Sequence, residues 1–342
     1  MNARVMTIGL ISAFAAAATA KAHHSQAQFN LDPAVVETIS GTVTQFDFKN
    51  PHVYLYLLTR ESGGGTAIWE LEASSTPNLI RRGWSRDSVR VGDELAIDIH
   101  PAKVAGQRIA RINTIHFANG ETLAVRGEDG VRPPADQSAR STSLAGRWLG
   151  RYGLSQVTLD LDQWPLTAKG HAAQQAYDGT QNPQIDCIPV ASPSFMLYSN
   201  IFEVTRSSDR IVIDGEWLDV GRVIYLDGRA HPPAEERSLQ GHSIGRWEGK
   251  TLVVDTANFS EHGAGNAFEV PSGLQKHLVE RLTLSDDGKR VNYEFVLEDP
   301  EYLSQPVTGS GIWDYRPDLE PQRIECDPEV ARRFLERMIP KE

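Results

Sequence analysis

Residues 37–48 read ETISGTVTQFDF, and this stretch decides the fold because polar and apolar side chains alternate along it. A period of two places successive side chains on opposite faces of a strand, so that one face is buried and the other meets water. Similar short runs follow at residues 53–58, 67–73, 94–100 and 108–117. We therefore predict a first domain built from five half-buried strands.

A short helix is expected between the third and the fourth of these strands. Residues 76–84 read TPNLIRRGW, in which Thr76 can cap a helix, Pro77 suits its first turn and Gly83 can end it. Three strands, a helix and two strands is the order of the OB-fold, a small and partly open barrel. We predict a mainly β protein that begins with an OB-like five-stranded barrel over residues 23–126.

A second β domain is expected after a linker. Residues 127–143 read GEDGVRPPADQSARSTS, and a stretch so rich in Pro, Gly, Ser and charge predicts a linker. Residues 144–342 contain many short strand-like runs, separated by turn residues such as those at 286–288. Sequential strands of this kind favour a larger antiparallel β-barrel or bent sheet. A C-terminal helix is predicted at residues 328–338, with Asp327 as its cap.

The start of the chain predicts export. Residues 1–22 combine a basic residue at Arg4, a run of apolar and small residues over 5–18, and an A-x-A pattern at 20–22. This order is typical of a signal peptide that is removed. No later stretch reaches the roughly 20 apolar residues that a transmembrane helix needs. We expect a soluble periplasmic or secreted protein without membrane insertion.

The charge of the chain bears on its partners. The sequence has 34 basic and 45 acidic side chains, which give a formal net charge of −11. Because nucleic-acid binding draws on a basic surface, nucleic acid is disfavoured as a partner. A small-molecule ligand is the favoured partner, and a protein partner is compatible with an OB-like barrel.

The chain contains two cysteines, Cys187 and Cys326. Since an exported chain reaches an oxidising compartment, we predict one disulfide between them. Free or metal-binding thiols are the alternative, although the sequence has no C-x-x-C spacing.

Several short motifs carry a resemblance to known families. The first domain contains His23-His24-Ser25, Gly41-Thr42-Val43, Asn50-Pro51-His52 and Gly83-Trp84. In these motifs it resembles an exported bacterial family that is known only as a domain of unknown function. The second domain, with residues 227–232 (DGRAHP) and 241–249 (GHSIGRWEG), is similar to an uncharacterised β-rich bacterial module. The resemblance implies export, but it implies no mechanism.

One group of titratable residues in the second domain is a candidate catalytic site. It consists of His231, His242, Asp255, His277 and Glu280, each in or beside a predicted strand near a turn. Histidine and acidic side chains together can act as general acids and bases, or as metal ligands. The alternative is a structural role for each residue, with His277 and Glu280 on opposite faces of one strand.

Tryptophans in the second domain suggest a binding site for an apolar molecule. Trp148, Trp217, Trp247 and Trp313 are the candidate ligand-binding residues, because a barrel lined by them can hold a small apolar ligand. The alternative is that they fill the core of the barrel.

A copper site is a further hypothesis. Cleavage after Ala22 would expose His23, whose terminal amine and imidazole can bind copper, a metal that favours nitrogen ligands. His24 and His52 are candidate further metal ligands, and the alternative is a solvated tail.

Three functions are compatible with these residues. The first is binding of a small apolar ligand outside the cytoplasm, and the second is copper binding through His23. The third is acid–base catalysis on an apolar substrate inside the second barrel, through its histidines and acids.

Overall fold

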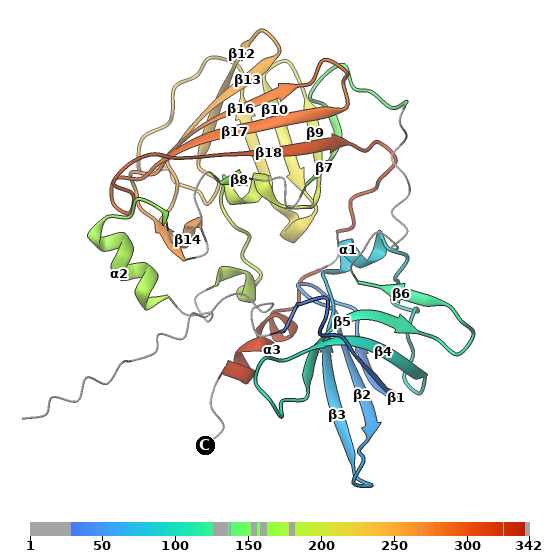
Figure 1. Cartoon of the computed structure of the whole chain (residues 1–342). Helices are drawn as coiled ribbons and strands as arrows, with labels where there is room; N and C mark the ends of the chain where they lie inside the picture. The colour runs from blue at the N-terminus through green and yellow to red at the C-terminus, as the bar shows by residue number, and fades with distance from the viewer. Residues whose placement is uncertain are drawn as a thin grey trace, which may run out of the picture.

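The computed structural model describes residues 29–125, 136, 138–151, 156–157, 163–177, 182–267, 269–323 and 325–338. It contains a small and a larger closed β-barrel, and Figure 1 shows them one above the other. The predicted signal peptide, His23 and His24, and the first nine residues of the predicted linker lie outside the described residues.

The small barrel has the OB-like strand order that the sequence predicts. Strand β1 pairs with β2 and β4, β3 pairs with β2, and the pairing of β5 with both β3 and β4 closes the barrel. Its elements are β1 (Glu37–Asp47), β2 (Tyr54–Arg60), β3 (Thr66–Glu72), α1 (Thr76–Ile80), β4 (Glu94–Pro101), β5 (Ile109–His116) and β6 (Thr122–Ala124). Helix α1 is capped at Ser75, one residue before the predicted cap, and it lies at the end of the barrel that faces the larger one (Figure 1).

The alternation in the sequence explains the core of the small barrel. Val43, Leu55, Leu57, Ile97 and Ile99 belong to one cluster of buried apolar side chains, and each lies on the inner face of its strand. Burial of each such side chain stabilises the fold by about 1.5–3 kcal/mol. Because side chains alternate along a strand, the polar residues between them then face solvent.

The larger barrel has nine strands, and the pairing of β17 with β18 closes it. The strands of this domain are β7 (Gly146–Gly150), β8 (Gln156–Val157), β9 (Ile201–Arg206), β10 (Arg210–Gly215), β11 (Gly221–Tyr225), β12 (His242–Glu248), β13 (Thr251–Ala257), β14 (His262–Ala267), β15 (Val270–Ser272), β16 (His277–Leu284), β17 (Arg290–Glu298) and β18 (Val307–Tyr315). The antiparallel prediction needs one correction, because β11 and β12 are parallel. A parallel pair requires a long connection, and the chain between β11 and β12 supplies it.

Two more helices follow the small barrel in the chain. Helix α2 (Ala168–Ala176) was not expected from the sequence, and it begins where the Thr167 side chain accepts a hydrogen bond from the Gly170 amide. Helix α3 (Pro328–Met338) agrees with the prediction. Within the described residues, no helix has the length and apolar character that crossing a membrane requires.

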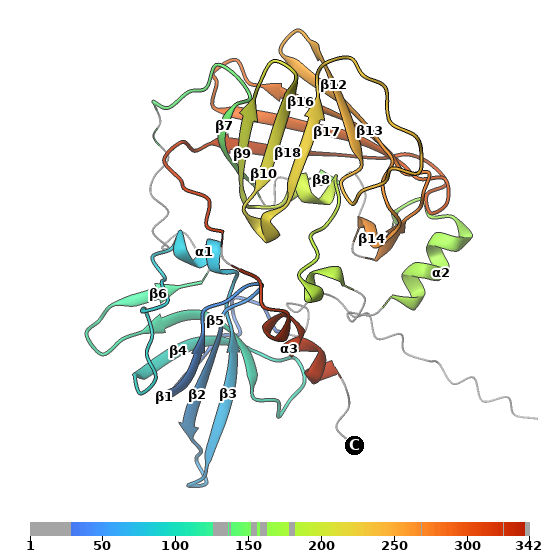
Figure 2. The same cartoon turned by 180° about the vertical axis from the view of Figure 1, so that it is seen from behind.

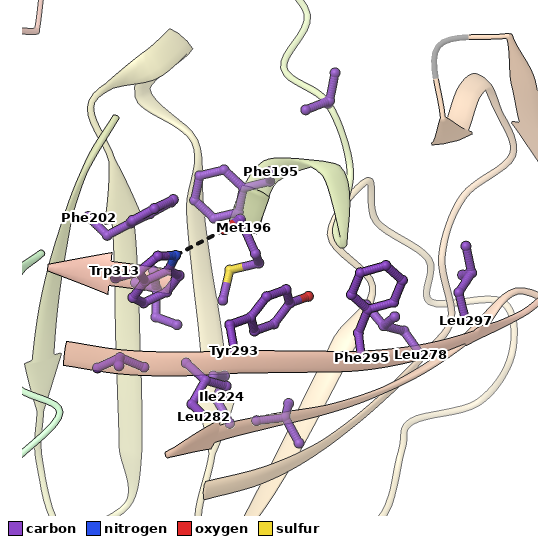
Figure 3. Packing of buried hydrophobic residues seen from close by; sticks show 14 of the residues in the cluster. Phe195, Met196, Phe202, Ile224, Leu278, Leu282, Tyr293, Phe295, Leu297 and Trp313 are labelled. Atoms are coloured by element: carbon purple, nitrogen blue, oxygen red, sulfur yellow. Dashed lines mark hydrogen bonds between the residues drawn. The ribbon is translucent and has the colours of Figure 1, made fainter. Parts of the chain in front are cut away.

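Aromatic side chains fill the interior of the larger barrel (Figure 3). The rings of Phe202 and Trp313 stack with their centroids 4.2 Å apart, and the Trp313 indole N–H donates to the Met196 carbonyl over 3.0 Å. Trp148 is 0% exposed, and its indole N–H donates to the Leu144 carbonyl. Trp148 and Trp313 are thus packed core residues, as the alternative in the sequence analysis has it, and their role in ligand binding stays a prediction.

The last segment of the chain returns to the small barrel. The predicted disulfide between Cys187 and Cys326 is present, and Cys326 forms a β-bridge with Asn50. In helix α3, the Arg333 guanidinium contacts the Asp47 carboxylate and donates to the Tyr56 hydroxyl over 3.3 Å. Figure 2 shows α3 beside the small barrel from the opposite side. The disulfide thus fixes a segment that joins the two barrels.

Replacement of both Cys187 and Cys326 by alanine should lower the free energy of unfolding by about 2–4 kcal/mol, because the cross-link restricts the unfolded chain. Hydrogen exchange should also become faster in helix α3. Urea unfolding and exchange measured by mass spectrometry test both effects, with reduced wild-type protein as the control. Unchanged exchange in α3 would contradict the proposed anchoring.

Candidate functional site

A pocket of about 550 Å³ lies between the two barrels, and we call it the interbarrel pocket. The small barrel contributes, among others, His52, Ser75, Asn78, Arg81, Arg82 and Arg111. The larger domain contributes Gln184, Tyr198, Ser199, Asn200, Glu216 and Trp217. Most of these side chains are polar, so the pocket differs in character from the apolar barrel interiors.

Glu216 joins the elements that form the pocket. Its carboxylate accepts hydrogen bonds from the Arg81 guanidinium over 2.7 Å and from the Ile201 amide over 2.9 Å. The backbone N–H of Gln322 donates a third hydrogen bond to this carboxylate over 3.0 Å. Arg81 lies just after α1, Ile201 begins β9, and Gln322 belongs to the segment that leads to Cys326. One buried carboxylate therefore holds both barrels and the C-terminal segment around the pocket.

Asn200 and Trp217 lie just outside the paired ends of β9 and β10. Asn200 precedes β9, and Trp217 begins a short 3-10 helix that follows β10. Asn200 is 5% exposed, and neither Nδ2 nor Oδ1 has a hydrogen-bond partner in the protein. The buried Nε1 atom of Trp217 also has none. The next residue, Leu218, has a positive φ of 55°, a strained conformation typical of functional sites.

His52, a further lining residue, contacts a buried carboxylate of the small barrel. Its Nδ1 atom lies 2.9 Å from the Glu72 carboxylate, which also accepts from the Arg111 guanidinium over 3.3 Å. Across the part of the chain that is described, no three His, Cys, Asp or Glu side chains are arranged to hold a metal ion. The copper prediction rests on His23 and His24, outside the described residues, and it stays a prediction.

Arginine dominates the electrostatics of the pocket. Burial lowers the pKa of Arg82, and the neighbouring charge of Arg81 lowers it further. Both causes mean that the positive charge of Arg82 is less stable here than in water.

Four of the five predicted catalytic side chains meet elsewhere, on the larger barrel. The Nδ1 atoms of His231 and His242 lie 3.0 Å apart, and the Nε2 atom of His231 lies 2.9 Å from the Asp255 carboxylate. The Nε2 atom of His277 lies 3.2 Å from the same carboxylate oxygen. Asp255 lies between two fully buried residues of β13, so strand alternation turns it to the outside of the barrel. The hypothesis of a site inside the barrel therefore does not fit these four residues.

The histidine–aspartate group is suited to proton transfer at the surface. Burial raises the pKa of Asp255, but hydrogen bonds from His231 and His277 outweigh burial, and the pKa is lowered overall. Burial lowers the pKa of His242, and the charge of His231 adds to this effect. A neutral His242 beside a carboxylate-oriented His231 can accept or pass on a proton. None of these four side chains lines the interbarrel pocket.

Glu280 does not join this group, and its assignment needs correction. It faces the interior of the larger barrel and is 0% exposed. Both carboxylate oxygens bind the Arg222 guanidinium, and the Tyr293 hydroxyl donates to Oε1 over 2.8 Å. Arg222 also donates to the hydroxyls of Ser243 and Thr256. Glu280 is therefore half of a buried structural ion pair.

The remaining two candidate tryptophans have different surroundings. Trp217 lines the interbarrel pocket, and its buried indole Nε1 atom has no hydrogen-bond partner in the protein. Trp247 packs against the core of the larger barrel, with the Arg206 guanidinium 4.8 Å from its ring centroid. Trp217 is thus the candidate tryptophan that lines the interbarrel pocket.

Sequence reasoning missed the main residues of the pocket, which are Asn200, Arg81, Arg82 and Glu216. The adjacent arginines stand in the predicted helix segment TPNLIRRGW, and that segment contains no acidic residue. This local excess of positive charge was the one available signal. Asn200 gave no signal, because its burial depends on contacts between the domains.

The family model of DUF6152, a family of unknown function, matches residues 11–110. The match covers β1 to β4 and α1 of the small barrel, in agreement with the resemblance seen in the motifs of this domain. The chain is thus similar to this family over its first domain, and a further β-rich domain follows. No curated protein is similar in sequence to the chain.

Proposed function

We propose that this protein is exported and binds a small molecule in the interbarrel pocket. The observation that carries the proposal is the buried amide of Asn200, which bonds to no protein group. Buried polar groups nearly always have partners, and an unsatisfied one costs about 1–3 kcal/mol. A ligand that bonds to Asn200 would remove this cost. The volume of the pocket is also in the usual range for ligand sites.

The ligand is polar rather than apolar. The interior of the larger barrel, where an apolar ligand was expected, is filled by its own aromatic side chains. The interbarrel pocket is instead lined mostly by polar residues, among them Asn200, Arg82 and Glu216. The signal-like residues 1–22 and the disulfide support export, because disulfides persist in oxidising compartments.

Native mass spectrometry of protein from the cells that naturally make it tests this proposal. Wild-type protein should carry a small molecule, and Asn200→Ala should carry much less of it. Asn292→Ala is a matched control, because Asn292 is exposed on β17, and it should retain the molecule. Wild-type protein that is always empty, or an Asn200→Ala variant that is equally loaded, would contradict the proposal.

A further inference from the structure

One side chain fastens part of the connection between β11 and β12 to the larger barrel. Residues 227–230 of this connection are exposed, whereas His231 is partly buried. Within the part of the chain that is described, His231 makes the hydrogen bonds that join residues 227–231 to the strands of the barrel. It contacts His242 at the start of β12 over 3.0 Å and Asp255 in β13 over 2.9 Å. The position of this segment therefore depends on the state of the His231 imidazole.

The neighbouring contacts of the segment do not titrate where imidazoles do. The Arg229 guanidinium stacks over the Tyr225 ring at 3.8 Å. Further along the chain, the Asn258 side-chain amide donates to the carbonyls of Pro232 and Pro233 over 3.0 and 3.3 Å. Guanidinium, phenol and amide groups keep their charge state between about pH 5 and 8. A change of pH in this range thus acts on residues 227–231 through His231 and its partners.

The contact between the two Nδ1 atoms limits the number of protons that the histidine pair can hold. Because the Asp255 carboxylate accepts from His231 Nε2, this nitrogen carries a proton. When both rings are neutral, the Nδ1–H of His242 donates to the bare Nδ1 of His231. When only His231 is charged, the direction of this bond reverses and the contact remains. When both rings are charged, both Nδ1 atoms carry protons, and two positive groups 3.0 Å apart repel each other.

The surroundings of the pair determine which ring takes the second proton. The first proton is held at His231, because the Asp255 carboxylate lies beside it. Burial lowers the pKa of His242 from its usual value of 6.5, and the charge of His231 lowers it further. His242 therefore takes the second proton, at a lower pH than an ordinary imidazole. The other titratable or charged groups that face the pair are Tyr225, Asp227, Arg229 and Glu236 around His242, and His277 and Glu298 beyond Asp255.

We propose that His231 and His242 form a pH-sensitive latch, which we call the histidine latch. It holds residues 227–231 against the barrel while at most one of the two rings is charged, and it releases this segment when both are charged. None of these residues lines the interbarrel pocket, so the latch is independent of the proposed ligand site.

Linkage gives the direction of the effect. Two released rings are solvated and bind protons near the usual imidazole pKa of about 6.5, whereas the closed pair takes its second proton only at lower pH. The released form therefore binds more protons than the closed form below about pH 6.5. The ratio of released to closed protein should rise as the pH falls, by up to about tenfold per pH unit.

A spin label on Ala230→Cys measures the release in the full, signal-cleaved chain. The two native cysteines are bonded to each other, so the label reacts only with the introduced one. We expect a slow component to dominate the electron paramagnetic resonance spectrum at pH 7.5. The ratio of the mobile to the slow component should rise at least about tenfold at pH 5. A label on Ala105→Cys, in an exposed loop of the small barrel, should not respond.

His242→Asn tests the role of charge in the labelled Ala230→Cys protein. The asparagine side chain stays neutral, and its amide can donate to or accept from His231 Nδ1. The label should therefore remain slow at pH 5. His171→Asn, at an exposed histidine of α2, is the matched control and should respond as the unaltered latch does.

Nuclear magnetic resonance of the imidazole C–H groups needs no change at His242. The midpoint at which His242 titrates should equal the midpoint at which the label becomes mobile. Equal label mobility at pH 7.5 and pH 5, an unaltered response in folded His242→Asn, or release at a pH where His242 does not titrate would each overturn the proposal.

Discussion

Replacing Arg222 with methionine should lower the free energy of unfolding of the larger barrel by about 3–5 kcal/mol. Arg222 and Glu280 are 2% and 0% exposed, so loss of either partner leaves an uncompensated charge in the core. The double variant Arg222→Met/Glu280→Leu should recover at least half of the loss, because a buried ion pair contributes little more than a well-packed apolar pair.

Urea unfolding followed by tryptophan fluorescence measures these changes. The exposed ion pair of Lys250 and Asp286 supplies a control, since solvent screens it, and Lys250→Met should cause no measurable loss. A double variant that is as unstable as Arg222→Met would contradict this expectation. The loss of stability would then come from the hydroxyl groups that bond to the ion pair, and not from an unpaired charge.

Stability should rise with pH between about 7 and 10.5, and Lys276 is the reason. This side chain is buried, and its ammonium group donates to the carbonyls of Ser192 over 2.7 Å and Gly265 over 2.5 Å. Burial lowers its pKa from 10.5 to about 7. The unfolded chain therefore holds a proton on Lys276 over a pH range in which the folded chain has released it. By linkage, the free energy of unfolding gains up to about 1.4 kcal/mol per pH unit across this window.

The test measures urea unfolding of wild-type protein and of Lys276→Met at several pH values from 7 to 10. The contributions of other titrating groups cancel in the difference between the two unfolding free energies. The difference in unfolding free energy between the two proteins should change with pH, in favour of wild type at high pH. Lys250→Met, an exposed control, should follow wild type throughout. Parallel pH profiles for wild type and Lys276→Met would refute the assignment.

The strand pattern made the small barrel predictable. Period-two alternation in residues 37–48, together with a helix signal after the third strand, determined the OB-like order. The same reasoning predicted the strands of the larger barrel but not the parallel pairing of β11 with β12. Local alternation identifies a strand, but it carries no information about the direction in which two strands pair. Helix α2 was missed because its sequence, AKGHAAQQA, has few apolar residues to show a helical period.

The arrangement of the candidate site residues was only partly predictable. His242, Asp255 and His277 lie on the neighbouring strands β12, β13 and β16, and His231 contacts them from the connection between β11 and β12. Strand alternation sends Glu280 to the opposite face. The pocket could not be predicted, because it depends on contacts across long sequence separations. Arg81 and Glu216, for example, are 135 positions apart.

The return of the C-terminal segment to the small barrel has a consequence for the order of synthesis. The small barrel leaves the ribosome first, but Asn50 and Asp47 receive their partners Cys326 and Arg333 only when the last residues of the chain emerge. Glu216 likewise gains its bond to Gln322 only then. A nascent or truncated chain can therefore contain every strand of both barrels and still lack the contacts that Asn50, Asp47 and Glu216 make with the C-terminal segment.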